Sequence, residues 1–395
     1  MTLFSGVRIA ALATAAMVLA APAGAETLRA YIGTYTVDPS SPRPTGRSEG
    51  IYVANVDSVT GAISNVKLAA KDLSPSWLTL SADRKFLYAV NEIESYGPNK
   101  SGSVTAYVVG ADGGLKKLNT VDSGGSIPCY ISFDPSKKFV LVANYTGGTF
   151  SVICLKADGS LGETTDIVKP EGPMGVYQST ERPPGMQGSK QEHGSRGHMI
   201  LPDPSGQYIV GADAGRDQIF VWKLNTTTGK LAQVSVTKTL AGSAPRHFVF
   251  SHDGKKLYQL FEQTSRLGVY DFKDGKLTMV GKTVSSLPNG YAGANTGSEL
   301  LISKNGKNLY FGNRTQDSIG VFAIGADGGV TRIANVSTEG NNPRSLTLDP
   351  SEKFIYSLNQ GADNITSYTI GANGVPKFTG KYVPLGTPAI MVFAK

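Results

Sequence analysis

The most constraining feature of this sequence is a unit of about 20 residues that recurs along most of its length. Each copy consists of two short runs of alternating apolar and polar residues around a turn, as in "APRHFVFSHDGKKLYQLFE" at 244–262. Strict alternation is typical of half-buried β-strands, and a turn rich in Asp, Gly and Lys joins them into a hairpin. The other copies begin at Ser74, Ile127, Arg196, Thr296 and Asn342.

Most copies are followed by a third strand, such as "DQIFVWKL" or "DSIGVFAI", and by a turn leading into a fourth. Four strands per repeat at this spacing are typical of β-propeller blades. Six complete copies account for residues 73 to about 383, and the leftover ends supply a seventh. "LRAYIGTYT" resembles a second strand, "GIYVANV" a third, and the C-terminal "TPAIMVFAK" a first. We therefore predict an all-β, seven-bladed propeller over residues 26–395, closed by a C-terminal strand that joins the N-terminal blade.

Residues 1–25 have the pattern of a signal peptide. Arg8 precedes an apolar stretch that ends in small residues, and Ala23-Gly24-Ala25 provides a cleavage site. The stretch is too short for a comfortable membrane span. We expect a periplasmic or secreted protein that starts near Glu26 and is not inserted in the membrane after signal removal.

The charged residues and the cysteines argue against a nucleic-acid partner and a zinc site. The net charge is +7, but the lysines are scattered beside turns such as "DPSKKF", which does not favour nucleic-acid binding. Only two cysteines, Cys129 and Cys154, are present, and the blade alignment places them on non-adjacent strands. We expect two free, buried thiols and no zinc site.

Aligning the blades on their turns predicts two rings of side chains at one mouth of the central channel. In an antiparallel hairpin, the start of one strand and the end of the next share a face. One ring comes from the start of the innermost strands: Ser76, Cys129, His198, Arg246, Ser298 and Arg344. The other comes from the ends of the second strands: Tyr35, Glu92, Tyr145, Ala214, Glu262, Arg314 and Gln360. The long insertions near 37–49, 93–102 and 164–193 fall on the same face, and long loops gathered at one end of a rigid scaffold predict a binding site there.

The segments "GHMILPDPSGQYIVGAD", "APRHFVFSHDGKKLYQLFE" and "LYFGNRTQDSIGVF" resemble the seven-bladed lactonase family. That family contains 6-phosphogluconolactonases, gluconolactonases and fungal carboxymuconate-lactonizing enzymes, and the resemblance covers nearly all of the chain after residue 25. It implies a functional set of His198, Arg246, Glu262 and Arg314. The segment "HGSRGH" departs from relatives with two closely spaced histidines, which leaves the role of His193 open.

Each member of this set suits a step of ester hydrolysis. Glu262, ionised beside arginines, is the first candidate for a general base, and His198 is the second. Arg246 and Arg314 would stabilise an oxyanion, although ion pairing that rigidifies the ring is the alternative for both. His247 should point to the opposite side of its strand from Arg246 and serve the structure. The remaining site residues would bind substrate hydroxyls: Tyr35, Glu92, Tyr145, Arg344, Gln360 and His193.

The function expected is hydrolysis of a small sugar lactone by activated water, without a metal or organic cofactor. Because the N-terminus predicts export, glucono-1,5-lactone is placed ahead of its 6-phosphate. A muconate-type cycloisomerase and a non-catalytic ligand-binding propeller remain alternatives. A calcium-dependent gluconolactonase fits less well, since two glutamates among three arginines make a poor cation site.

Overall fold

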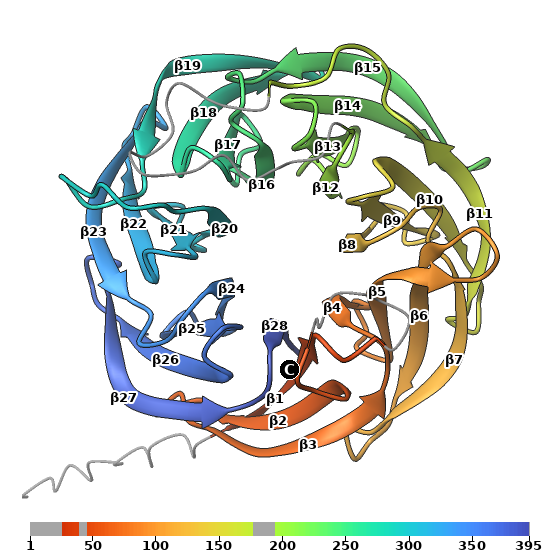
Figure 1. Ribbon diagram of the computed structural model, residues 1–395, viewed down its shortest axis with the longest axis horizontal. Coiled ribbons are helices and arrows are strands. Elements are labelled where there is room, and N and C mark those ends of the chain that lie inside the picture. The colour runs from red at the N-terminus through yellow and green to blue at the C-terminus, as the bar shows by residue number, and fades with distance from the viewer. Residues whose placement is uncertain (1–25, 39–45, 177–193, 395) are drawn as a thin grey trace, which may run out of the picture.

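The computed structural model describes residues 26–38, 46–176 and 194–394. Its 28 β-strands form seven antiparallel four-stranded sheets, which are arranged as blades around one axis (Figure 1). The predicted all-β, seven-bladed propeller is therefore confirmed. None of the described residues forms a helix of the length and hydropathy needed to span a bilayer.

The strands of each blade run in order from the axis to the rim. Blade 1 consists of β28 (Pro388–Phe393), β1 (Thr27–Thr34), β2 (Gly50–Asp57) and β3 (Ile63–Lys71). Blade 2 consists of β4 (Pro75–Leu80), β5 (Phe86–Tyr96), β6 (Ser101–Val109) and β7 (Leu115–Asp122). Blade 3 consists of β8 (Pro128–Phe133), β9 (Phe139–Asn144), β10 (Thr149–Leu155) and β11 (Leu161–Val168). Blade 4 consists of β12 (Gly197–Pro202), β13 (Ile209–Asp213), β14 (Gln218–Asn225) and β15 (Lys230–Lys238).

The last three blades repeat the same order. Blade 5 consists of β16 (Pro245–Phe250), β17 (Lys256–Phe261), β18 (Arg266–Lys273) and β19 (Lys276–Ser285). Blade 6 consists of β20 (Gly297–Ile302), β21 (Asn308–Asn313), β22 (Ser318–Ile324) and β23 (Val330–Ser337). Blade 7 consists of β24 (Pro343–Leu348), β25 (Phe354–Asn359), β26 (Asn364–Ile370) and β27 (Pro376–Pro384).

The two ends of the chain complete blade 1 together. β28 pairs antiparallel with β1, with Ile32 opposite Met391 and Ala30 opposite Phe393. All four side chains are at least nine-tenths buried. The predicted closure by the C-terminal strand is confirmed, and it supplies blade 1 with its fourth, innermost strand.

An aspartate side chain stabilises the repeated turn between the first two strands of a blade. In blade 3, Asp134 Oδ1 accepts a hydrogen bond from the N–H of Phe139 at 2.8 Å. Asp203 and Asp349 do the same for Tyr208 and Phe354 in blades 4 and 7. An aspartate side chain that accepts a hydrogen bond from the backbone across the turn fixes the shape of that turn. This explains why the sequence "DPS" recurs between the first and second strands.

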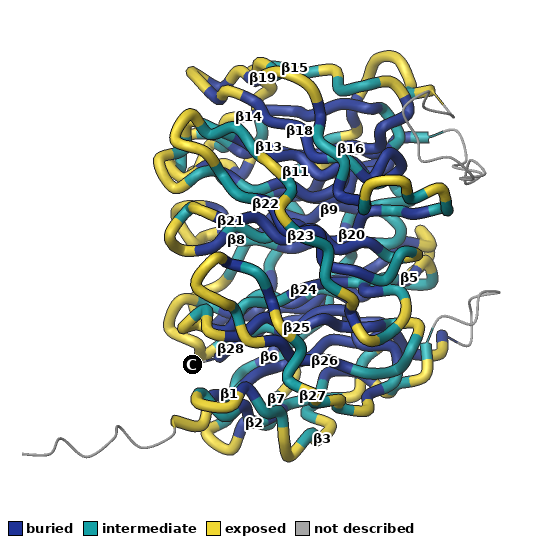
Figure 2. The backbone as a smooth tube through the Cα atoms, turned by 90° about the vertical axis from the view of Figure 1, so that its left-hand side faces the viewer, coloured by how far each residue is buried: buried dark blue, intermediate teal, exposed yellow. Residues whose placement is uncertain are grey.

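Neighbouring blades are joined through buried tyrosines on their second strands. The Tyr88 hydroxyl of blade 2 donates to the carbonyl oxygen of Gly159 in blade 3 at 2.8 Å. Tyr258 reaches Gly328 in the same way from blade 5 to blade 6, at 3.1 Å. The rings fill the apolar space between sheets and their hydroxyls remain hydrogen-bonded. As a result the inner and middle strands are buried, while exposed residues gather at turns and on the rim (Figure 2).

Candidate functional site

A β-bulge at the start of every innermost strand shapes the centre of the propeller. In blade 5, Pro245 pairs with Phe261 and Phe248 with Gln259, so Arg246 and His247 together face a single residue of β17. The same one-residue shift occurs at the start of the other six inner strands. A bulge re-aims the side chains of its extra residues, and bulges are frequent beside active sites. Two successive residues per blade can therefore contribute to the centre of the ring.

We call the first bulged residues the inner ring. The outer ring consists of the residues that directly follow the second strands, together with Glu92, which lies within the longer β5 of blade 2. The inner ring consists of Ser76, Cys129, His198, Arg246, Ser298, Arg344 and Ala389. In all seven blades the outer-ring N–H donates to the carbonyl of the residue preceding the inner strand: Tyr35 to Thr387, Glu92 to Ser74, Tyr145 to Ile127, Ala214 to Arg196, Glu262 to Ala244, Arg314 to Thr296 and Gln360 to Asn342. These bonds place the two predicted rings against each other.

Glu262 is the centre of the first charged cluster. Its Oε2 lies 3.2 Å from Nε of Arg246, and its Oε1 lies 3.2 Å from Nη2 of Arg314. Arg246 is 1% exposed, whereas the side chains of Glu262 and Arg314 are 13% and 18% exposed. The Glu262 carboxyl group thus lies between two guanidinium groups at the open side of the inner ring.

Glu92 is the centre of a second cluster in blades 1, 2 and 7. Its Oε2 accepts a hydrogen bond of 2.8 Å from the Tyr35 hydroxyl and lies 3.5 Å from Nη2 of Arg344. The Arg344 guanidinium also lies 5.6 Å from the centre of the Tyr35 ring. Burial raises the pKa of Tyr35, so this phenol stays neutral and acts as a donor.

His198 lies between Cys129 and Arg246 in the inner ring. Its Nδ1 is 3.7 Å from Sγ of Cys129, and its ring packs edge-on against Tyr145 with centroids 5.5 Å apart. Burial, reinforced by the charge of Arg246, lowers the pKa of His198 well below its usual range. The imidazole is therefore neutral at pH 7. Burial also raises the pKa of the Cys129 thiol, which disfavours a nucleophilic thiolate.

Several buried polar atoms of the inner ring have no hydrogen-bond partner among the described residues. They are Nη1 of Arg246, Oγ of Ser76 and Oγ of Ser298, whereas Nε of Arg246 has the ion-pair contact with Glu262 but no hydrogen bond. Buried polar groups in folded proteins are nearly always partnered, so unpaired ones at a functional site point to water or a ligand. Burial and the charges of Arg314 and Arg344 lower the pKa of Arg246 to about 9, which still leaves the guanidinium charged at pH 7.

The second bulged residues form a layer of side chains that we call the floor: Trp77, Tyr130, Met199, His247, Glu299, Ser345 and Ile390. The rings of Trp77 and His247, three blades apart, have centroids separated by only 5.2 Å. The expectation that His247 points away from the channel is therefore wrong, because the bulge breaks the alternation on which it rested. The floor closes the centre of the ring beneath Arg246 and His198.

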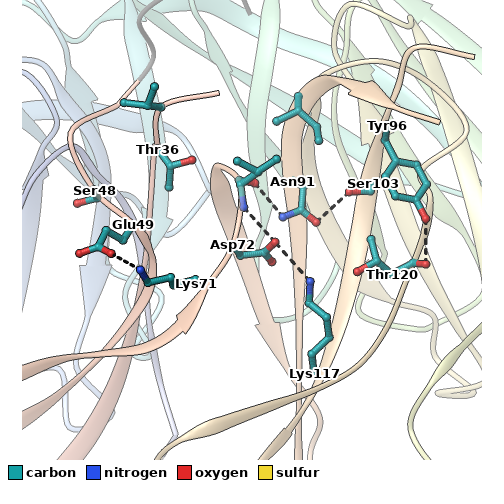
Figure 3. Close-up of a pocket in the computed structure, with 13 residues that line it drawn as sticks. Thr36, Ser48, Glu49, Lys71, Asp72, Asn91, Tyr96, Ser103, Lys117 and Thr120 are labelled. Atoms are coloured by element: carbon teal, nitrogen blue, oxygen red, sulfur yellow. Dashed lines mark hydrogen bonds and ion pairs between the residues drawn. The ribbon is translucent and has the colours of Figure 1, made fainter. Parts of the chain in front are cut away.

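A separate cavity of about 580 Å³ lies between blades 1 and 2, but its polar groups are already engaged with one another. Asn91, for example, donates to the Leu73 carbonyl at 2.8 Å and accepts from Ser103 at 3.0 Å. Figure 3 shows three pairs of lining residues: Asn91 with Ser103, Lys71 with Glu49, and Lys117 with Asp72. The unpaired polar groups of the inner ring make the channel mouth the stronger candidate.

Other predicted residues meet different outcomes. Gln360 lies in the outer ring as expected, and its carbonyl oxygen accepts a hydrogen bond from Arg47 at 3.2 Å. His193 lies outside the described residues. Both thiols are free as predicted, but only Cys129 is buried, since Cys154 lies further along its blade towards the rim and is partly exposed. Among the described residues, no three His, Cys, Asp or Glu side chains gather as a metal site would require.

Sequence reasoning overlooked Glu299, which the structure places in the floor. Its Oε1 lies 2.8 Å from Nδ1 of His247, and it is 4% exposed. Burial raises the pKa of Glu299 to about 8. A glutamate in "TGSELLIS", within an otherwise apolar inner strand, is the feature of the sequence that could have revealed it.

Comparisons with known proteins agree with this architecture. The chain matches the family described as "Lactonase, 7-bladed beta-propeller" over residues 29–393. It is 29% identical over 342 residues to a 6-phosphogluconolactonase of Bacillus subtilis, covering 86% of this chain and 90% of the relative. Among solved structures, it resembles a putative 6-phosphogluconolactonase from Bacteroides fragilis (27% identity, TM-score 0.80, 93% and 98% of the two chains).

A second similar structure is the periplasmic gluconolactonase of Pseudomonas aeruginosa, at 26% identity and a TM-score of 0.81, with coverage of 93% of this chain and 99% of that one. The family match spans every blade of the propeller. The chain therefore belongs to the seven-bladed β-propeller lactonase family of enzymes.

Proposed function

We propose that this protein hydrolyses the 1,5-lactone of gluconate 6-phosphate at the channel mouth, with Glu262, His198, Arg246 and Arg314 as its catalytic residues. The observation that carries the proposal is the buried Arg246 guanidinium: its Nη1 has no hydrogen-bond partner among the described residues, and its Nε has only the ion-pair contact with Glu262. Donors fixed in this way can stabilise an oxyanion without reorganising during the reaction.

In the proposed mechanism, a water molecule bound by Glu262 attacks the lactone carbonyl carbon. Glu262 accepts one proton of that water, and Arg246 and Arg314 donate hydrogen bonds to the oxyanion of the tetrahedral intermediate. The bond between the carbonyl carbon and the ring oxygen then breaks, and the ring oxygen takes up the proton as a hydroxyl group. The net change is the addition of one water molecule, which opens the ring to the acid.

His198 has a more restricted part in this proposal than Glu262. Its buried imidazole is neutral at pH 7 because its pKa is lowered, so it is a weak base. We assign it to hydrogen bonding with the substrate near the attacked carbon. We propose that substrate hydroxyl groups are bound by other members of the two rings: Tyr35, Glu92, Tyr145, Arg344 and Gln360.

Two considerations support the phosphorylated substrate, which the sequence had placed second. The similar proteins include 6-phosphogluconolactonases of Bacillus subtilis and Formosa agariphila and a putative 6-phosphogluconolactonase of Bacteroides fragilis. In addition, the rings carry Arg246, Arg314 and Arg344 against Glu262 and Glu92, so their charge is net positive. A guanidinium binds phosphate oxygens well.

Unphosphorylated glucono-1,5-lactone is the second candidate. It is supported by residues 1–25, whose pattern predicts export, and by the similarity to the Pseudomonas gluconolactonase. A periplasmic or secreted enzyme would meet this lactone rather than the phosphate ester, which cells retain. The second candidate therefore requires that the protein is exported.

The deciding experiment is the kcat/KM ratio of the two lactones, measured by acid release with spontaneous hydrolysis subtracted. The protein should begin at Glu26, and the native host should be fractionated in parallel. Preference for the 6-phosphate supports the first candidate. Preference for glucono-1,5-lactone together with a protein outside the cytoplasm would replace it with the second, and hydrolysis of neither would refute both.

A further inference from the structure

His247 and Glu299 connect the bulges of blades 5 and 6 beneath the inner ring. Nδ1 of His247 lies 2.8 Å from Oε1 of Glu299, and the two residues are 1% and 4% exposed. Each is the second residue of its bulge, and the first residues of the same bulges are Arg246 and Ser298. The contact therefore joins the two backbone segments that aim these inner-ring side chains.

Further hydrogen bonds fix both partners in place. Nε2 of Gln259 donates to the carbonyl oxygens of His247 at 3.0 Å and Leu260 at 2.7 Å. On the other side, the N–H of Leu300 donates to Oε1 of Glu299 at 3.1 Å. The bulge of blade 5 is thus held through its backbone by Gln259 and through its side chain by Glu299.

Packing against other blades restrains the His247 ring as well. Its centroid lies 5.1 Å from that of His198, 5.2 Å from Trp77 and 5.5 Å from Tyr130. Close-packed interiors transmit displacements, so moving the His247 ring would move His198 and the bulge that carries Arg246.

The pair is uncharged at neutral pH. Burial and Arg246 lower the pKa of His247 well below its usual range, whereas burial raises that of Glu299 to about 8. The titratable and charged groups that act on the pair come from five strands or their ends: Arg246 on β16, Arg344 on β24, Arg314 after β21, His198 on β12 and Tyr130 on β8. A neutral floor leaves Glu262 as the one carboxylate in ion-pair contact with Arg246 among the described residues.

We propose that His247 and Glu299 are positioning residues, which hold Arg246 and His198 in the geometry required for the reaction. The inference rests on the proposed function, since the step that it serves is oxyanion stabilisation by Arg246. Neither residue needs to touch the substrate. If the guanidinium is misplaced by a fraction of an ångström, its hydrogen bonds to the transition state are weakened more than its contacts with the bound substrate. The effect should therefore fall on kcat rather than on KM.

The test compares Glu299→Ala, Glu299→Gln and Ile390→Val with the wild type at pH 7. Ile390 is an apolar floor residue of blade 1 and serves as a matched control for a core substitution. We expect Glu299→Ala to lower kcat about tenfold or more with KM changed less than about threefold. The amide of Glu299→Gln preserves the hydrogen bond to His247 and should keep kcat within about threefold of the wild type.

A second measurement does not require turnover. The Nε–H resonance of Arg246, assigned by its absence in Arg246→Lys, reports the environment of the guanidinium by ¹⁵N NMR. It should shift in Glu299→Ala and stay in place in Glu299→Gln and Ile390→Val. Thermal melts accompany each variant so that losses of activity are compared only between folded proteins.

The outcomes separate this inference from the proposed function. A wild type that hydrolyses neither lactone refutes the function, and the Arg246 resonance then decides whether the pair positions the guanidinium. An unshifted resonance with wild-type kcat in Glu299→Ala would overturn the inference. Equal impairment of Glu299→Gln and Glu299→Ala would overturn it too, because the carboxyl group itself would then be required.

Discussion

Nε of Arg246 lies 3.2 Å from Oε2 of Glu262, and these residues are the inner-ring and outer-ring members of the same blade. The first hairpin of blade 5 brings them together: one residue lies in the bulge at its start and the other directly follows its second strand. Because Arg314 of blade 6 contacts the other carboxylate oxygen, the same contact also spans two blades. The Glu262 side chain therefore joins two blades, and substitutions can test whether it also serves the reaction.

Glu262→Gln should abolish most of the activity while the propeller stays folded. The amide keeps the size of the side chain but cannot accept a proton from water, so we expect kcat to fall by a factor of about 10² to 10⁴. Steady-state assays of lactone opening provide the measurement, and circular dichroism melts provide the control for folding. Full activity in this variant would remove Glu262 from the role of general base.

Arg246→Lys should be more damaging than its conserved charge suggests. A lysine ammonium cannot reproduce the fixed donors of the guanidinium at this buried position. The expected loss is about 10²- to 10³-fold in kcat, as for removal of an oxyanion donor. Arg344→Lys is the comparison, since Arg344 pairs with Glu92 in the proposed substrate-binding cluster and should act mainly on KM. Equal kcat effects in the two variants would contradict this division of roles.

The stability of the protein should depend on pH through Glu299. Its folded-state pKa is raised from 4.5 to about 8, so the folded protein holds a proton that the unfolded chain releases. This favours folding fully below about pH 4.5, and the advantage is lost as the pH rises towards 8. Each bound proton corresponds to at most about 1.4 kcal/mol per pH unit in the free energy of unfolding.

Glu299→Gln isolates that contribution because the other titrating groups are shared with the wild type. The free energy of unfolding in urea, measured for both proteins at several pH values, should decline more steeply for the wild type as the pH rises between about 5 and 8. Parallel curves would show that Glu299 titrates normally.

The two thiols should differ in reactivity. Cys129 is 4% exposed and burial raises the pKa of its thiol, whereas Cys154 is partly exposed. A disulfide reagent should therefore modify one thiol of the native protein and two after unfolding in guanidinium chloride. Cys154→Ser should leave the native protein unreactive, and rapid modification of this variant would contradict the burial of Cys129.

Much of the ring could be predicted because hairpin geometry is encoded locally. The turn aspartates and the alternating strands fix where each blade starts, so Arg246, Glu262 and Arg314 could be placed at one mouth before any contact was known. The contacts of Glu262 with both arginines agree with that placement. The chemical roles of these residues stay predictions.

The floor could not be predicted in the same way. Alternation with a period of two assigns Arg246 and His247 to opposite faces, and only the bulge turns both inwards. The contact between Trp77 and His247 crosses the ring, so it depends on the positions of blades far apart in the chain. The contact between His247 and Glu299 likewise requires the bulges of two neighbouring blades to be placed correctly.

The pairing of β1 with β28 has a consequence for biosynthesis. The inner neighbour of β1 is β28, which is translated after all the other strands of the propeller. While the ribosome is still at work, the inner edge of β1 has unpaired backbone groups, which other chains could occupy. Joining segments so distant in sequence also makes this step slow, since long-range contacts cost loop entropy before they stabilise. The ring of blades is therefore closed only after β28 has been made, and until then the inner edge of β1 is open to pairing with other chains.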